Sequence, residues 1–252
     1  MVLVKTFFAY NDLRNYSYLI FDKTTGNSWV IDPYESNTII DYIRKNGLVL
    51  KGILNTHQHS DHTRGNFLLC KTFQCPVQHL GSEESIQLDP AYSIKALNTP
   101  GHTLDHQAFL FSKMEKPIAL FSGDTLFNSG VGNCMGGGDV DLLFNSIRTL
   151  MALPAQTILY PGHDYRKRNL EFALTIEPEN KKIIEKISEI ARESTELLPP
   201  VTLKDELMVN PFLRLDSLEI RQNLMKKIDS LHGEEENSRE FFKYLRKLRD
   251  QW

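Results

Sequence analysis

The stretch Thr56-His57-Gln58-His59-Ser60-Asp61-His62 contains four potential metal ligands within six residues, directly after the apolar segment Gly52-Ile53-Leu54-Asn55. His57 and His59 are two positions apart, so on an extended segment their side chains point to the same side. Asp61 and His62 follow on the turn beyond. Imidazole and carboxylate together suit a transition metal such as zinc better than calcium or magnesium. We therefore predict a metal site here rather than a solvated polar loop.

Three further candidate ligands each follow an apolar run and a glycine. They are His102 in Thr99-Pro100-Gly101-His102-Thr103, Asp124 in Phe121-Ser122-Gly123-Asp124-Thr125, and His163 in Tyr160-Pro161-Gly162-His163-Asp164. Any one of these motifs alone is compatible with an ordinary turn. Their repetition indicates strand ends that meet at one rim of a sandwich, where glycine permits tight turns and loops carry chemistry. With His57, His59, Asp61 and His62, these residues predict a hydrolytic site for two metal ions.

The pattern of the chain changes near residue 165. Before it, short apolar strands such as Tyr18–Phe21 and Trp29–Ile31 alternate with helical stretches around 37–46, 65–73 and 140–151. After it, we expect no further strands, and apolar residues recur at helical spacing over Glu179–Leu198, Ser217–Leu231 and Ser238–Arg249. This pattern predicts an α/β fold, an αββα sandwich over residues 1–165, followed by a helical domain over residues 166–252.

Composition limits the classes of partner. The net charge is -3 and the isoelectric point is about 6.2, which gives no electrostatic reason to expect nucleic acid. No stretch reaches the length of a membrane span, and the first residues do not resemble a signal peptide, so we expect a cytoplasmic protein that does not bind membranes. Three cysteines, an odd number, indicate reduced thiols rather than a disulfide framework.

These motifs resemble those of the metallo-β-lactamase superfamily. Within it, the chain is most similar to the type II glyoxalases, or hydroxyacylglutathione hydrolases. That resemblance also involves Gly123–Phe127, Gly162–Tyr165, Glu177–Asn180, Asn210–Arg214 and Asp250–Trp252. It implies a metallo-β-lactamase-type sandwich with a C-terminal helical domain that binds substrate. It further implies that His57, His59 and His102 hold one metal, that Asp61, His62 and His163 hold a second, and that Asp124 bridges the two.

A metal pair lowers the pKa of bound water toward 7 and so supplies a nucleophile without serine or cysteine. A thioester suits such a site because its thiol, with a pKa near 8.5, can leave as thiolate. The resemblance selects the substrate, S-D-lactoylglutathione or a related 2-hydroxyacyl thioester, cleaved to D-lactate and free thiol in methylglyoxal detoxification. Asp61 and Asp124 are the expected catalytic residues. We expect zinc, with iron or manganese as alternatives, and a monomer whose partner is this small molecule.

The predicted substrate contacts depart in part from the family pattern. Asn133 stands where these glyoxalases usually have a basic residue, and Met135 where they have an aromatic one, so a charge-assisted contact to glutathione is missing. Tyr165, Arg246 and Arg249 match family positions that contact substrate. The two arginines also fit a solvated basic end of a helix. The physiological thiol and acyl group therefore stay open.

Other functions remain as alternatives. A persulfide dioxygenase of the same superfamily would use a single iron, which would leave Asp61, His62 and His163 without a metal. A hydrolase acting on a thioester of a thiol other than glutathione would keep the whole ligand set. A non-catalytic scaffold is disfavoured because no ligand is lost, and a nuclease is disfavoured because no basic face is evident.

Overall fold

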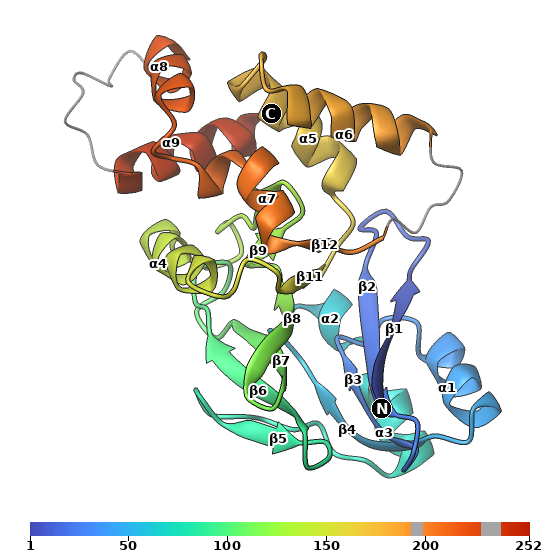
Figure 1. Cartoon of the computed structure of the whole chain (residues 1–252). Coiled ribbons are helices and arrows are strands. Elements are labelled where there is room, and N and C mark those ends of the chain that lie inside the picture. The colour runs from blue at the N-terminus through green and yellow to red at the C-terminus, as the bar shows by residue number, and fades with distance from the viewer. Residues whose placement is uncertain (193–198, 228–237) are drawn as a thin grey trace. The chain divides into compact units, whose positions relative to one another are not determined.

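The computed structural model describes residues 1–192, 199–227 and 238–252 (Figure 1). The chain divides into two compact units that alternate along the sequence. The first unit comprises Met1–Asn98, Asp105–Asp124 and Tyr160–Asp164, and the second comprises Thr99–Leu104, Thr125–Leu159 and Tyr165–Trp252. The boundary at residue 165 between a catalytic and a substrate-binding domain stays a prediction.

One sheet of the first unit has the strand order β1-β2-β3-β4. Its strands are β1 (Val2–Phe8), β2 (Tyr16–Asp22), β3 (Asn27–Ile31) and β4 (Val49–Leu54). The first three run antiparallel, whereas β3 and β4 are parallel. A parallel pair needs a crossover connection, and helix α1 (Ser36–Lys45) supplies it. Every residue of β2 is buried, which requires that both faces of the sheet are covered.

Helices α1 and α3 (Asn66–Phe73) cover one face of this sheet (Figure 1). Ile39 and Ile43 of α1 and Leu69 of α3 are fully buried in a single apolar cluster with Leu19 of β2 and Ile53 of β4. The isoleucines are four positions apart, which places them on the same side of the helix. The predicted helices around 37–46 and 65–73 are confirmed.

The second group of strands in the first unit is antiparallel, in the order β8-β7-β6-β5. These strands are β5 (Ser85–Gln87), β6 (Tyr92–Asn98), β7 (Gln107–Lys113) and β8 (Lys116–Gly123). The ring centroids of Tyr18 on β2 and Phe121 on β8 are 5.2 Å apart, so aromatic side chains of the two sheets meet in the core. A short helix, α2 (Ser60–Thr63), follows β4 and carries Asp61 and His62.

The second unit is mainly helical. It contains the hairpin β9 (Leu126–Phe127) and β10 (Gly130–Val131), and the helices α4 (Val140–Met151), α5 (Arg166–Ile176), α6 (Lys181–Arg192), α7 (Leu203–Val209), α8 (Leu218–Lys227) and α9 (Ser238–Gln251), with the 3-10 turn η1 (Pro211–Leu213). Phe242 of α9 makes edge contacts with Phe144 of α4 and Phe212 of η1, each with ring centroids 5.4 Å apart. The predicted helix at 140–151 and the helical character of the tail are confirmed. The ends of two predicted helices, at 193–198 and 228–231, lie outside the described residues.

The expectation that no strand follows residue 165 is wrong. Strand β11 (Ile158–Pro161) begins in the second unit, and its first two residues pair antiparallel with β12 (Val201–Thr202). Thr202 then begins α7 with a capping box, in which its hydroxyl accepts from the Asp205 N–H and the Asp205 carboxylate accepts from the Thr202 N–H.

The three cysteines are free, in agreement with the expected reduced thiols. Within the described part of the chain, no helix has both the length and the apolarity needed to cross a membrane.

Candidate metal centre

In the first unit, the candidate ligands lie just beyond the ends of three strands. The predicted run 57–62 follows β4, Asp124 follows β8, and His163 follows β11. The ends of β11 and β8 are joined by a backbone hydrogen bond from Gly162 N–H to the Gly123 carbonyl at 2.9 Å, and Thr56, after β4, accepts at 2.7 Å from the N–H of Gln107, the first residue of β7. The expectation that strand ends meet at one rim is confirmed for these residues.

Two overlapping groups of potential ligands lie entirely within the first unit. One is His57, His62 and Asp124, and the other is Asp61, His62 and His163; in each, one ligand atom per residue lies within 4.8 Å of the others. The Nε2 atoms of His62 and His163 are 3.2 Å apart. Asp124 approaches both rings, with Oδ1 3.4 Å from His62 Nε2 and Oδ2 3.2 Å from His163 Nε2. Nitrogen and carboxylate oxygen therefore converge on a common centre, as a metal ion requires.

The opposite nitrogen of each of these rings is held by the protein. His62 Nδ1 is 2.9 Å from Asp32 Oδ2, and His163 Nδ1 is 2.8 Å from the carbonyl oxygen of Leu13. The Asp32 carboxylate also accepts from the Thr56 N–H and hydroxyl. Metal-binding histidines commonly donate their second N–H to a carboxylate or carbonyl, which fixes the tautomer with a lone pair on the metal side. The donor set thus fits a divalent metal.

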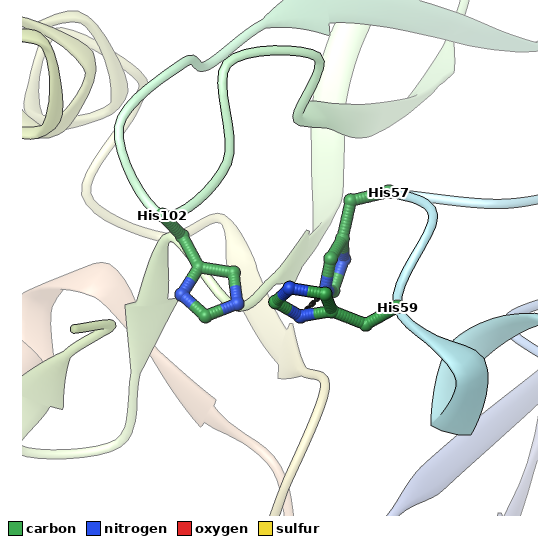
Figure 2. Close-up of side chains that lie close together, drawn as sticks. All are labelled: His57, His59 and His102. Carbon is green, nitrogen blue, oxygen red and sulfur yellow. Dashed lines mark hydrogen bonds between the residues drawn. The ribbon is translucent and has the colours of Figure 1, made fainter. Parts of the chain in front are cut away.

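His57 and His59 lie side by side beyond β4 (Figure 2). His57 Nε2 and His59 Nδ1 are within hydrogen-bond distance at 2.9 Å, and His57 Nδ1 is 3.0 Å from the Thr56 hydroxyl. Figure 2 also labels His102, which belongs to the second unit. There, His102 is buried and its Nδ1 is 2.7 Å from the carbonyl oxygen of Asn133.

Charge is balanced within the buried cluster. Burial opposes a charge on His62, but the nearby carboxylates of Asp124, Asp32 and Asp61 raise its pKa to about 9. Burial likewise opposes a charge on Asp124, yet His163 and His62 hold the pKa of its carboxyl well below the usual value. The carboxylates therefore stabilise positive charge beside the ring nitrogens.

Two glycines leave room for this arrangement. Gly123 has φ +49, and a Cβ there would lie 2.6 Å from both His106 Nε2 and the Thr56 hydroxyl. At Gly162 a Cβ would lie 2.3 Å from Asp124 Oδ1 and 2.9 Å from His62 Cε1. Both glycines belong to the motifs that the sequence singled out, and both are needed because side chains approach the backbone closely.

The sequence reasoning missed two buried polar residues of this centre. His106 Nε2 accepts from the Asp124 N–H at 3.1 Å, and its ring stacks on His57 with centroids 5.1 Å apart. Asp32 contacts Thr56 and His62 as described above. The signal that could have found Asp32 is the same as for the ligands, because it directly follows β3.

The predicted substrate-binding residues all lie in the second unit. Met135 is 76% exposed, and its N–H donates to Asn133 Oδ1. Tyr165 is partly buried and packs edge-on against Phe127, with centroids 5.2 Å apart. The backbone carbonyl of Asn133 contacts His102, so this loop is joined directly to a predicted metal ligand.

Arg246 and Arg249 have partners within the second unit. Arg246 is buried, donates to the carbonyls of Val131 and Gly132, and forms an ion pair with Asp250 at 2.9 Å. Arg249 donates to Asn169 Oδ1 at 3.2 Å, and burial together with the nearby Arg246 charge lowers its pKa to about 10. Their contact with substrate stays a prediction, and the geometry gives Arg246 a second task, which is to hold the loop after β10.

Two family models match the chain. Residues 10–98 match the metallo-beta-lactamase superfamily, and residues 164–252 match the hydroxyacylglutathione hydrolase C-terminus. A solved metallo-beta-lactamase from Staphylococcus aureus is similar in fold, with a TM-score of 0.66 and 21% identity over 98% of this chain and 71% of that one. The sandwich with a C-terminal helical region is therefore confirmed.

Similarity to curated proteins extends over the full length. A hydroxyacylglutathione hydrolase of Polaromonas sp. is 36% identical over 100% of both chains. A cytoplasmic hydroxyacylglutathione hydrolase of Arabidopsis thaliana is 35% identical over 94% of this chain and 95% of its own. From these full-length matches, and from the clusters of histidine and aspartate at the strand ends, the chain belongs to the hydroxyacylglutathione hydrolases, the type II glyoxalase branch of the metallo-β-lactamase superfamily.

Proposed function

We propose that this protein hydrolyses S-D-lactoylglutathione to D-lactate and glutathione at a centre of two divalent metal ions. The observation that carries the proposal is the convergence of the His62 and His163 Nε2 atoms with the carboxylates of Asp61 and Asp124 in one buried cluster. Family membership supplies the class of substrate. The product thiol needs no strong general acid to depart, which suits a site that offers carboxylates and imidazoles.

We assign the ligands as the family pattern orders them. His57, His59 and His102 would hold one ion, Asp61, His62 and His163 the other, with Asp124 between them. This partition is supported by the two groups within the first unit and by the position of His102 beyond β6. Zinc accepts this mixture of imidazole and carboxylate, and iron or manganese can occupy the same donors.

When bound, the metal pair would activate water and polarise the thioester carbonyl. The protein's own residues prepare the centre for that chemistry. Asp32 and the Leu13 carbonyl orient His62 and His163, so that each presents Nε2 to the centre. Asp61 and Asp124 would supply negative charge against the cations, and Asp61 would also offer an oxygen for the proton that water gives up. Asp61, with its side chain 18% exposed, is the more accessible of the two carboxylates.

We further propose that the loop with Asn133 and Met135, together with Tyr165, Arg246 and Arg249, forms the site for the thiol part of the substrate. The exposure of Met135 and the partial burial of Tyr165 support this role. The protein would act as a cytoplasmic monomer, with the thioester as its only required partner.

Steady-state hydrolysis of S-D-lactoylglutathione, measured with metal content on the same purified sample, tests the proposal. We expect turnover and about two metal ions per chain. If the protein cleaves only thioesters of another thiol, the proposed metal centre stands, but glutathione is not the thiol of the substrate. One iron per chain with oxygen uptake in the presence of a persulfide would contradict the hydrolytic function.

A further inference from the structure

The loop between β1 and β2, residues 9–15, belongs to the first unit and contacts two of the predicted ligands of the second metal. This loop lies more than 40 residues from either ligand, because Asn15 and Asp61 are 46 positions apart and Leu13 and His163 are 150 apart. None of the metal motifs in the sequence includes it. The loop therefore supplies contacts to predicted metal ligands that the sequence motifs do not include.

Asn15 orients the carboxylate of Asp61. The fully buried Asn15 amide donates from Nδ2 to Asp61 Oδ2 at 2.9 Å. Its direction is fixed, because Asn15 Oδ1 accepts from Asn11 Nδ2 and the Asn15 N–H donates to Asn11 Oδ1. The Asn15 backbone also forms a β-bridge with His163. One residue thus positions a ligand through its side chain and contacts another through its backbone.

Leu13 fixes the ring of His163. Its carbonyl oxygen is 2.8 Å from His163 Nδ1, so a proton on Nδ1 is favoured and the lone pair of Nε2 faces the cluster. A carbonyl oxygen can act in this way only if the backbone of the loop is held in place.

Arg14, between these two residues, holds that backbone. It has φ +56, a left-handed conformation that residues other than glycine seldom adopt. Its guanidinium forms an ion pair with Asp164 Oδ2 at 2.7 Å and donates to the Asp164 carbonyl at 3.2 Å, while the Asp164 N–H donates to the Arg14 carbonyl. The guanidinium also lies over the Phe8 ring, 4.9 Å from its centroid. A strained residue persists where the surroundings over-determine its conformation, and these four contacts do so.

We propose that Arg14 is a positioning residue for the second metal. By binding Asp164, the neighbour of His163, it holds the 9–15 loop so that Leu13 and Asn15 orient His163 and Asp61. This inference rests on the proposed binuclear centre and extends it to residues outside the ligand set. Loop and metal then stabilise each other, since a ligand that binds an ordered state favours that state.

The test is a titration of the metal-free, full-length protein with Zn²⁺. Binding is measured by calorimetry, in the absence of substrate. Arg14→Gly is the first variant, because glycine adopts the left-handed backbone without strain while the side chain and its guanidinium contacts are removed. Wild type should show two binding events. In Arg14→Gly one event should weaken, by about 10- to 100-fold if the contacts of Leu13 and Asn15 with their ligands are lost with the loop, while the other stays unchanged.

A double-mutant cycle with Asp164→Asn distinguishes loss of the Arg14–Asp164 ion pair from a general loss of stability. The double variant should lose no more affinity than Arg14→Gly alone, because both changes break the same ion pair. Arg14→Lys should recover part of the loss. Lys113→Ala is the matched control, since Lys113 likewise lies over an aromatic ring, that of Tyr92, at the end of β7 far from His106.

Amide hydrogen exchange gives a second readout that does not depend on affinity. Saturating Zn²⁺ should protect the backbone amides of residues 11–15 in wild type at least tenfold more than in Arg14→Gly. Equal affinities for both ions and equal protection in the two proteins would overturn the proposal. A wild-type protein that binds one ion would overturn both the positioning role of Arg14 and the binuclear centre. If wild type binds two ions and Arg14→Gly weakens one of them, but the protein does not hydrolyse the thioester, only the proposed function is rejected.

Discussion

The backbone N–H of Asp124 donates to Nε2 of His106 at 3.1 Å, and both residues are buried. The acceptor role requires that the His106 proton sits on Nδ1, so the ring is neutral and in one tautomer. Its stacking on His57 links the predicted bridging carboxylate to a predicted ligand of the first metal.

Replacing His106 by Ala should leave the Asp124 N–H buried without an acceptor and should open a cavity beside His57. We expect a loss of about 1–3 kcal/mol in the free energy of unfolding. Metal content per chain should fall as well, measured by elemental analysis after dialysis. His79→Ala, at an exposed position, is the control and should change neither quantity.

Replacing Asp124 by Ala should abolish thioester hydrolysis while the fold stays intact. The change removes the carboxylate that lies against both His62 and His163 Nε2 atoms, so the centre loses charge that balances the cations. The measurement combines kcat with circular dichroism of the same preparation. Turnover close to that of wild type would contradict the binuclear mechanism.

Replacing Asn133 by Lys should lower KM for S-D-lactoylglutathione and leave kcat nearly unchanged. The side chain would gain a charge for the glutathione carboxylate, a contact roughly twice as strong as a neutral one. The backbone carbonyl that contacts His102 is retained. Asn133→Gln is the neutral control, and an unchanged KM in the Lys variant would place recognition elsewhere.

The buried side chain of Glu206 should make the free energy of unfolding depend on pH. It is buried and accepts hydrogen bonds from the Ser129 N–H and from Asn128 and Asn210, but burial outweighs these bonds and raises the pKa to about 7, from 4.5. Because the folded pKa is the higher one, this group stabilises the fold most below pH 4.5, and that contribution is lost as pH rises to 7.

The free energy of unfolding of wild type should therefore decline relative to Glu206→Gln between pH 4.5 and 7, by at most about 1.4 kcal/mol per pH unit, the effect of one proton. Urea unfolding at four pH values measures this slope. The side-chain amide of Glu206→Gln has one acceptor oxygen where the carboxylate has two, so the free energies of unfolding of the two proteins should also differ by an amount that is constant at all pH values. Only the change of the difference with pH tests the prediction. The exposed Glu179→Gln control should match wild type, and parallel curves for Glu206→Gln would refute the prediction.

Local sequence patterns predicted most of the helices and strands correctly. The helical stretch expected around 37–46 is α1, and a glycine directly before each ligand marked the positions of Asp124 and His163. Helix α5 gave a weaker signal, because its buried residues include the polar Arg166 and Asn169 as well as Phe172, so apolar residues alone do not mark the buried face. Strand β12 has two residues, too few to show a period.

The remaining parts of the site depend on contacts between distant segments. Nothing near Asn15 in the sequence indicates that its amide faces Asp61, and nothing near Arg246 distinguishes a solvated basic tail from a guanidinium buried against two carbonyls. Such roles follow from the pairing of strands and the packing of helices, which a single sequence does not specify residue by residue.

His62 and His163, whose Nε2 atoms are 3.2 Å apart, are separated by 101 positions in the chain. The ribosome therefore completes most of the second sheet, and part of the second unit, before the partner of His62 exists. Closing so long a loop is entropically costly, and a metal ion held by both rings acts as a reversible cross-link over that distance. The same ions that equip the centre for hydrolysis would thus add their binding free energy to the stability of the folded chain, and a chain that meets no metal would unfold more readily.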